Sequence, residues 1–220
     1  EDLSRRDFTI NAFAMNSEYE IVDLFNGKKD LNDKLIKTIG PASVRFNEDA
    51  LRVLRALYFS SKLDFDLDED ILSSFKQEDV KNLKEEYVKD MLFKVLSFDS
   101  NKGLEYILQY DILKAFPFYN QVVELSLKYN VKTNVYSLYL LFNKEFPKDI
   151  VISKRDKQKA LDIVYFINNK FNKESLFYGN INLLSDSINL YNSVYNEDLI
   201  FEDVMDEYKN LMIHSIKEID

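Results

Sequence analysis

From residue 47 onward, apolar residues recur at the three- and four-residue spacing of an α-helix face. The connections are short, and Asp, Asn or Ser precedes several of the expected helices as a cap. Neither an internal repeat nor a low-complexity linker interrupts the pattern, which predicts a string of packed helices. We expect these helices over residues 47–63, 68–76, 85–98, 101–109, 118–129, 133–145, 153–170, 181–195 and 199–218.

Residues 1–40 have the different pattern of the end of an α/β unit. Arg6–Met15 reads as a helix, Tyr19–Leu24 alternates like a strand, and Asn26-Gly27 is typical of a turn. Gly40-Pro41 breaks regular structure and marks a boundary. Because one strand cannot form a sheet, we expect partners from outside this chain, so that the chain begins inside a larger protein.

Composition limits the class of protein. Of the 220 residues 46% are hydrophobic, and 17 Phe and 14 Tyr can fill a substantial core. There is no cysteine, which excludes a disulfide framework and a thiolate metal site. No apolar run approaches membrane-spanning length and no signal pattern is present, so we expect no membrane partner and a cytoplasmic location.

Charge points to one segment of the chain. A net charge of −9 argues against broad, non-specific nucleic-acid binding. The chain has six Arg against 23 Lys, and five of the six Arg lie within the first 55 residues. Arg offers a planar fork for phosphates and base edges that Lys cannot copy. This segment is therefore the predicted site.

Within it, residues 45–55 read as the opening of a helix. Asn47 is a good N-cap, and Glu48 and Asp49 place negative charge in the first turn. Asp49, Arg52 and Arg55 follow one another at intervals of three, and Glu48 lies one turn before Arg52. A carboxylate and a guanidinium are thus expected side by side on one surface.

Such a pair has two interpretations. An ionised Asp only accepts hydrogen bonds and an Arg only donates them, so Asp49 and Arg52 can read a base edge with an amino donor beside a ring-nitrogen acceptor. Cytosine and adenine present that edge, whereas uracil and guanine present a carbonyl beside a ring N–H. The alternative is an ordinary intrahelical ion pair, which stabilises a helix by about a few tenths of a kcal/mol.

Three motifs together carry a resemblance. They are Ser4-Arg5-Arg6-Asp7, Asp23-x-x-x-Gly27 and Glu48-Asp49-x-x-Arg52, the last led by Arg45-Phe46. In their order and spacing the chain resembles the class II tRNA nucleotidyltransferases, the CCA-adding enzymes, and the related bacterial poly(A) polymerases. The resemblance is close from residue 1 to about residue 117 and loose beyond.

The resemblance implies a mostly α fold. Residues 1–40 would be the end of a small α/β nucleotidyltransferase head, followed by an elongated helical neck, body and tail. The neck, residues 41–105, would recognise the base; the body would be residues 106–150, and the tail, residues 151–220, would bind tRNA.

The resemblance also implies a nucleotide site. Asp7 would accept a ribose hydroxyl, Arg5 or Arg6 would bind ribose or phosphate, and Arg55 would meet phosphate. Glu48 and Arg45 would give support. The implied nucleotide-binding residues are Arg5, Arg6, Asp7, Asn11, Asp49, Arg52 and Arg55.

Asp23 and Gly27 would form a hinge between head and neck. A tight turn at Asn26-Gly27 in a plain hairpin explains them as well. An exposed, mixed-charge helix start likewise explains Arg5 to Asp7, and a local cap is the alternative to a site role for Asn11. The family often has an Arg where this chain has Tyr58, which leaves contacts there open.

The implied activity is template-independent addition of CCA to the 3′ end of tRNA from CTP and ATP, with Mg²⁺. The carboxylates that hold Mg²⁺ are expected upstream of residue 1, so we predict no catalytic residue and no metal ligand here, and binding without catalysis by this chain alone. We interpret the acidic run at residues 64–70 as a capped connection. The alternatives are a poly(A) polymerase and a non-catalytic helical RNA-binding protein.

Overall fold

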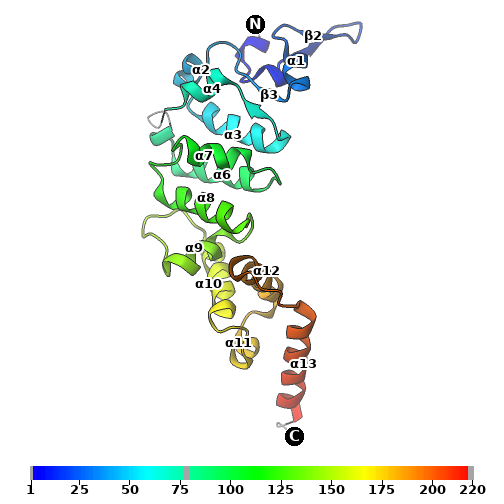
Figure 1. Cartoon of the computed structure of the whole chain (residues 1–220), viewed down its shortest axis with the longest axis vertical. Helices are drawn as coiled ribbons and strands as arrows, with labels where there is room; N and C mark the ends of the chain where they lie inside the picture. The colour runs from blue at the N-terminus through cyan, green and yellow to red at the C-terminus, as the bar shows by residue number, and fades with distance from the viewer. Residues whose placement is uncertain (1, 77–79, 218–220) are drawn as a thin grey trace. The chain divides into compact units, whose positions relative to one another are not determined.

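The computed structural model describes residues 2–76 and 80–217, with side chains to residue 212. It is mostly α-helical with two small sheets, which confirms the predicted fold class (Figure 1). The chain forms two compact units, Glu1–Val123 and Glu124–Asp220. The finer division into neck, body and tail stays a prediction.

The first unit carries all the strands of the described chain. Its elements are the 3-10 helices η1 (Leu3–Arg5) and η2 (Thr9–Asn11), the strands β1 (Phe13–Met15), β2 (Ile21–Asp23), β3 (Leu35–Ile36) and β4 (Asp66–Leu67), and the helices α1 (Gly27–Asn32), α2 (Ala42–Glu48), α3 (Leu51–Leu63), α4 (Glu69–Ser74), α6 (Glu85–Leu96) and α7 (Lys102–Gln109).

The first 40 residues differ from the prediction. The expected helix over Arg6–Met15 is wrong, since these residues form η2 and β1. The predicted strand is confirmed as β2, but it pairs antiparallel with β1, Ala14 opposite Val22, so the expectation that it has no partner in this chain is also wrong. β3 and β4 pair in parallel, and Phe8 and Thr38 form an isolated antiparallel bridge.

Helix α3 is the centre of the first unit. It packs on α6 and α7, which lie beside it (Figure 1). The apolar side of α3 is completely or almost completely covered, as the 0% exposure of Val53 and the 1% exposure of Leu57 show. Leu92 of α6 and Leu104 of α7 are buried as well. The opposite side of α3 is left to its arginines.

The acidic run at residues 64–70 connects α3 to α4, as predicted. Asp64 ends α3 in the left-handed conformation, with a φ of 56°. Asp68 caps α4 by accepting a hydrogen bond from the backbone N–H of Asp70. Asp66 forms an ion pair with Lys102 at 2.8 Å. The carboxylates of Asp66 and Asp68 and the backbone of Asp64 therefore have local structural roles.

The second unit is entirely helical in the part that the structure describes. Helix α8 (Pro117–Tyr129) contains the boundary between the units. The remaining elements are α9 (Val135–Asn143), α10 (Lys154–Asn168), α11 (Lys173–Tyr178), η3 (Ile181–Leu183), α12 (Leu184–Tyr195) and α13 (Phe201–Lys217).

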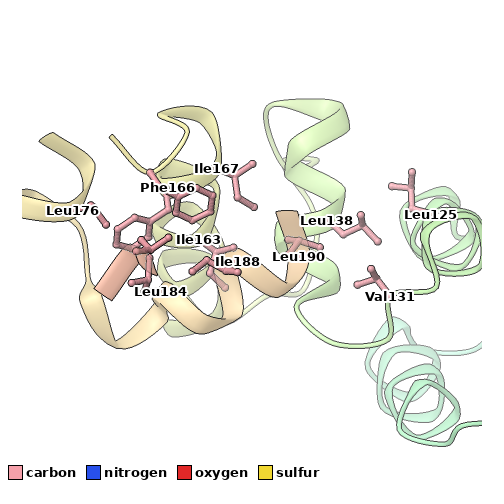
Figure 2. Close-up of a cluster of buried hydrophobic side chains, with 12 residues drawn as sticks. Leu125, Val131, Leu138, Ile163, Phe166, Ile167, Leu176, Leu184, Ile188 and Leu190 are labelled. Atoms are coloured by element: carbon pink, nitrogen blue, oxygen red, sulfur yellow. The ribbon is translucent and has the colours of Figure 1, made fainter. Parts of the chain in front are cut away.

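Helix α10 organises this second core. It contacts α9, α11 and α12, and its Ile163 and Phe166 are completely buried. Figure 2 shows Ile163 and Phe166 directed toward Leu184 and Ile188 of α12, with Leu176 of α11 close by. Three short helices form where the sequence predicted none, namely α1, α2 and α11.

No helix among the described residues is long and apolar enough to cross a membrane.

Candidate functional site

The chain bends between α2 and α3, where one continuous helix from residue 47 was predicted. Asp49 is extended, with φ −153° and ψ 103°, so α2 ends at Glu48 and α3 begins at Leu51. The N-cap position of α3 is Ala50, and the carboxylate of Asp49 accepts the first backbone N–H of the new helix, that of Leu51, through Oδ1 at 3.0 Å. Asn47 is therefore not the cap. Asp49 competes for backbone N–H groups, as short carboxylates do at helix starts.

The side chain of Arg52 is held from three directions. Nε donates to Asp7 Oδ1 at 2.8 Å, and Nη1 donates to Glu48 Oε2 at 2.7 Å and to the carbonyl oxygen of Arg45 at 2.8 Å. The predicted support of Arg52 by Glu48 thus takes the form of a direct hydrogen bond. Only 12% of the Arg52 side chain is exposed. Its Nη2 donates no hydrogen bond to any described residue.

Arg55 bridges two carboxylates. Its Nε lies 2.7 Å from Asp7 Oδ2, and its Nη2 donates to Asp49 Oδ2 at 2.7 Å and to Asp7 Oδ1 at 3.3 Å. The guanidinium that binds Asp49 is consequently that of Arg55 rather than that of Arg52. The sequence placed Asp49, Arg52 and Arg55 on one helix surface, but the bend moves Asp49 toward Arg55.

These contacts shift the pKa values of the network. The hydrogen bond from Arg52 is the main reason that the pKa of Glu48 is lowered. Burial raises the pKa of Asp49, but hydrogen bonds from Arg55 and the backbone N–H of Leu51 outweigh burial and lower it. Burial also opposes charge on Arg52, but Glu48 and Asp7 raise its pKa. These shifts favour the charged forms of Glu48, Asp49 and Arg52.

Arg45 joins the N-terminal segment to α2. Its Nη2 donates to the carbonyl oxygens of Arg6 at 2.8 Å and Arg5 at 3.3 Å. Its Nη1 donates to Glu48 Oε2 at 2.7 Å, the same oxygen that Arg52 uses. Arg45 therefore fixes the backbone that carries Asp7 relative to the bend that carries Asp49.

Backbone contacts hold Asp7 in place as well. Its carbonyl oxygen accepts the N–H of Ile39 at 3.2 Å, and the N–H of Thr9 donates to the carbonyl of Lys37 at 2.9 Å. Residues that are far apart in the sequence thus fix the position of the Asp7 carboxylate.

The other predicted residues lie at the margin of this network. Arg5 is exposed, and Arg6 is 48% exposed, with Nη1 donating to the carbonyl of Asn11 at 3.2 Å. The side-chain Oδ1 of Asn11 is buried without a hydrogen-bond partner among the described residues. Both guanidinium groups therefore lie in exposed side chains near the network.

Asp23 and Gly27 have a clear local role. Asp23 Oδ1 accepts the N–H of Gly27 and Oδ2 that of Lys28, both at 2.9 Å, so Asp23 caps α1. The alternative interpretation, a hairpin turn at Asn26-Gly27, is wrong, because the turn between β1 and β2 lies at residues 16–20 and Gly27 begins a helix. Gly27 is needed for a close approach: a Cβ there would lie 2.2 Å from the carbonyl oxygen of Thr9.

Sequence reasoning missed the ties between these segments. Arg45 and Arg52 contact residues 5–7, which lie about 40 positions earlier in the sequence, and no local pattern signals such contacts. The clustering of Arg within the first 55 residues and the motifs around Asp7 and Asp49 are the signals that pointed to this region.

Comparison with known proteins identifies the N-terminal segment and the fold. Residues 1–37 match the family described as the poly A polymerase head domain. The chain is 36% identical over 159 residues to the CCA-adding enzyme of Staphylococcus epidermidis, covering 70% of this chain and 39% of that enzyme. It is 55% identical over 69 residues to that of Streptococcus thermophilus, covering 31% of this chain and 17% of the enzyme. These matches span well under half the length of each relative.

Solved structures show the same fold. The CCA-adding enzyme of Bacillus stearothermophilus, solved in complex with CTP, has a TM-score of 0.73 at 21% identity, over 97% of this chain and 59% of that enzyme. The Thermotoga maritima enzyme, solved with tRNA, has a TM-score of 0.58 at 19% identity, over 94% of this chain and 59% of that enzyme. The chain is thus similar to CCA-adding enzymes, in sequence over 70% of its residues and in fold over 97% of them. This similarity confirms the resemblance predicted from its three motifs.

Proposed function

We propose that the protein containing this chain adds CCA to the 3′ end of tRNA from CTP and ATP, and that the bend between α2 and α3 reads the base. The observation that carries the proposal is the network of hydrogen bonds that joins Asp7, Glu48, Asp49 and Arg52, from two of the three motifs, with Arg55. The relatives are CCA-adding enzymes, and solved ones were obtained with CTP, ATP and tRNA.

The free hydrogen-bonding capacity of the network suits a base edge. The carboxylate oxygens of Asp49 each accept one hydrogen bond and have a further lone pair, and the side chain is 38% exposed. Arg52 Nη2 is a donor without a partner among the described residues. An amino group of cytosine or adenine can donate to Asp49 while the adjacent ring nitrogen accepts from Arg52. Uracil and guanine would place an acceptor against Asp49 and a donor against Arg52.

The sugar and the phosphates of the nucleotide would be bound by Asp7, Arg5 and Arg6. A carboxylate can accept a ribose 2′-hydroxyl, and guanidinium groups neutralise phosphates. We keep Asn11 in the proposal as a polar group of the nucleotide site, and Asp23 and Gly27 as the hinge. The tail would contact the tRNA backbone through the basic start of α10, where Lys154, Arg155 and Lys157 are exposed.

Nucleotidyltransferases of this kind generally use Mg²⁺, which supplies charge stabilisation at the α-phosphate. The described residues do not fit such a site, since they contain no group of three or more His, Cys, Asp or Glu that could hold a metal ion. Binding of Mg²⁺ by carboxylates upstream of residue 1 stays a prediction. Loss of catalysis by this chain alone and a cytoplasmic location stay predictions.

Asp49→Ala in the full-length protein tests the proposal. The variant is expected to lose about 1–3 kcal/mol of its preference for CTP over UTP and for ATP over GTP, because the acceptor that meets the amino group is gone. Extension of a tRNA lacking CCA with each nucleotide alone measures the preference. Unchanged preference would remove Asp49 from base reading. Extension by wild-type protein with ATP but never with CTP would favour a poly(A) polymerase instead.

A further inference from the structure

One guanidinium contacts two carboxylates from different parts of the chain. Arg55 lies in α3, Asp7 lies between η1 and η2, and Asp49 lies in the bend before α3. The Arg55 side chain is 2.7 Å from Asp7 Oδ2 through Nε and 2.7 Å from Asp49 Oδ2 through Nη2. With 28% of its side chain exposed, Arg55 lies mostly between the two carboxylates and not in solvent.

We propose that Arg55 is a positioning residue that couples recognition of the sugar to recognition of the base. This inference rests on the proposed function, in which Asp7 meets the ribose and Asp49 meets the base. Because the same planar group holds both carboxylates, displacement of one carboxylate changes the support of the other. A nucleotide with the wrong sugar therefore weakens base reading, and a wrong base weakens sugar reading.

The other cations of the network cannot take over this role. Arg52 binds Asp7, but its Nη1 is occupied by Glu48 and by the carbonyl of Arg45. Arg45 is directed to the carbonyls of residues 5 and 6 and to Glu48. Among the described residues, Arg55 is the cation with direct contacts to both Asp7 and Asp49.

The shape of the guanidinium matters as much as its charge. Nη2 donates to both Asp49 and Asp7, and Nε of the same rigid plane adds an ion-pair contact to Asp7, so the planar group fixes the angle between its contacts with the two carboxylates. A lysine ammonium is a point charge on a flexible stem and fixes no such angle. Arg55→Lys therefore keeps the charge and removes the coupling.

The test is extension of a tRNA lacking CCA by the full-length protein, with CTP, UTP and dCTP compared by kcat/KM. Arg55→Lys and Arg55→Gln are expected to lower both the CTP/UTP ratio and the CTP/dCTP ratio, each by about tenfold or more, the scale of one good polar contact in base discrimination. Lys62→Gln is the control on the same helix; Lys62 is exposed near the end of α3, with its ammonium over the ring of Tyr58. It is expected to leave both ratios unchanged.

A role for Arg55 in binding phosphate gives a different result. Since every nucleotide carries the same triphosphate, the KM would rise by one common factor and neither ratio would change, which overturns the coupling. A change in only one of the two ratios overturns it too. Failure of the wild-type protein to extend tRNA would count against the proposed function and not against the coupling by Arg55.

A second variant covers the case in which the Arg55 variants do not fold, as judged by circular dichroism. Asp49→Asn keeps the size of the side chain and weakens its contact with Arg55. If Arg55 couples the two carboxylates, this change at the base-reading residue also lowers the CTP/dCTP ratio, although Asp49 has no proposed contact with the sugar. An unchanged CTP/dCTP ratio in Asp49→Asn contradicts the coupling.

Discussion

At the scale of single residues, the sequence predicted which side chains meet but not how they pair. Glu48 and Arg52 were expected to interact, and they do, at 2.7 Å. Asp49 was expected beside Arg52 on one helix; instead it accepts the first N–H of α3 and binds Arg55. Helical spacing assumes a continuous helix, whereas a short carboxylate can take the backbone N–H groups and start a new one.

Gly27 gives a prediction at the same scale. A Cβ on Gly27 would lie 2.2 Å from the backbone carbonyl oxygen of Thr9, which cannot move without disturbing η2. Gly27→Ala is expected to lower the free energy of unfolding by about 1–3 kcal/mol, the usual cost of overpacking. Urea unfolding followed by circular dichroism measures the change.

Gly40→Ala is the matched control, since a Cβ there has nothing within 4 Å and meets only the cost of a φ of +86°. That cost is about 1–2 kcal/mol and is independent of packing. A Gly27→Ala variant as stable as wild type would show that Thr9 and α1 can separate freely.

At the scale of elements, the long helices with a strong apolar face were predictable and the short ones were not. The predicted helix over residues 85–98 corresponds to α6 (Glu85–Leu96), and that over 101–109 to α7. Helices α1 and α11 have six residues each, too few for a helical period to stand out. The expected helix over Arg6–Met15 forms 3-10 turns and β1 because tertiary pairing with β2 overrides its local pattern.

The cap of α1 has a pH dependence. Hydrogen bonds from the backbone N–H groups of Lys28, Gly27 and Phe25 lower the pKa of Asp23 below its ordinary value, outweighing burial. Since the pKa is lower in the folded state, the carboxylate stabilises the fold at pH values above about 4 and loses this effect as the pH falls through the folded-state pKa. Acid should therefore weaken α1.

Asp23→Ala is expected to lower the free energy of unfolding at pH 7 by about 1 kcal/mol, as loss of a helix cap does. It should also reduce the difference in stability between pH 7 and pH 3. Asp23→Asn, which keeps one acceptor oxygen, should lie between the two proteins at pH 7. Denaturant unfolding over this pH range gives the comparison. Identical pH profiles for wild type and Asp23→Ala would contradict the assignment.

At the scale of the whole molecule, composition and helical spacing predicted a mostly α chain but not its division. The boundary between Val123 and Glu124 falls inside α8, a continuous helix, so no breaker in the sequence marks it. The boundary between two units depends on which side chains share a core, and therefore on contacts between residues that are distant in sequence. The candidate site lies entirely within the first unit.

The two units allow stability and binding to be separated. Ile163 of α10 has no exposed surface and packs in the core of the second unit (Figure 2). Ile163→Ala is expected to destabilise that unit by about 2–5 kcal/mol through loss of buried surface and the cavity left behind. Nucleotide affinity, measured by isothermal titration of CTP into the full-length protein, should stay unchanged. A parallel loss of CTP affinity would show that the site needs the second unit.

The bend at Asp49 also limits how this segment can vary among related proteins. Asp49 belongs to extended backbone, whereas Arg52 and Arg55 belong to a helix in which each residue turns the next side chain by about 100°. One residue inserted after Asp49 would rotate both arginines away from Asp7. Evolution can exchange side chains around this bend, but the number of residues between the acid and the two arginines is expected to be fixed.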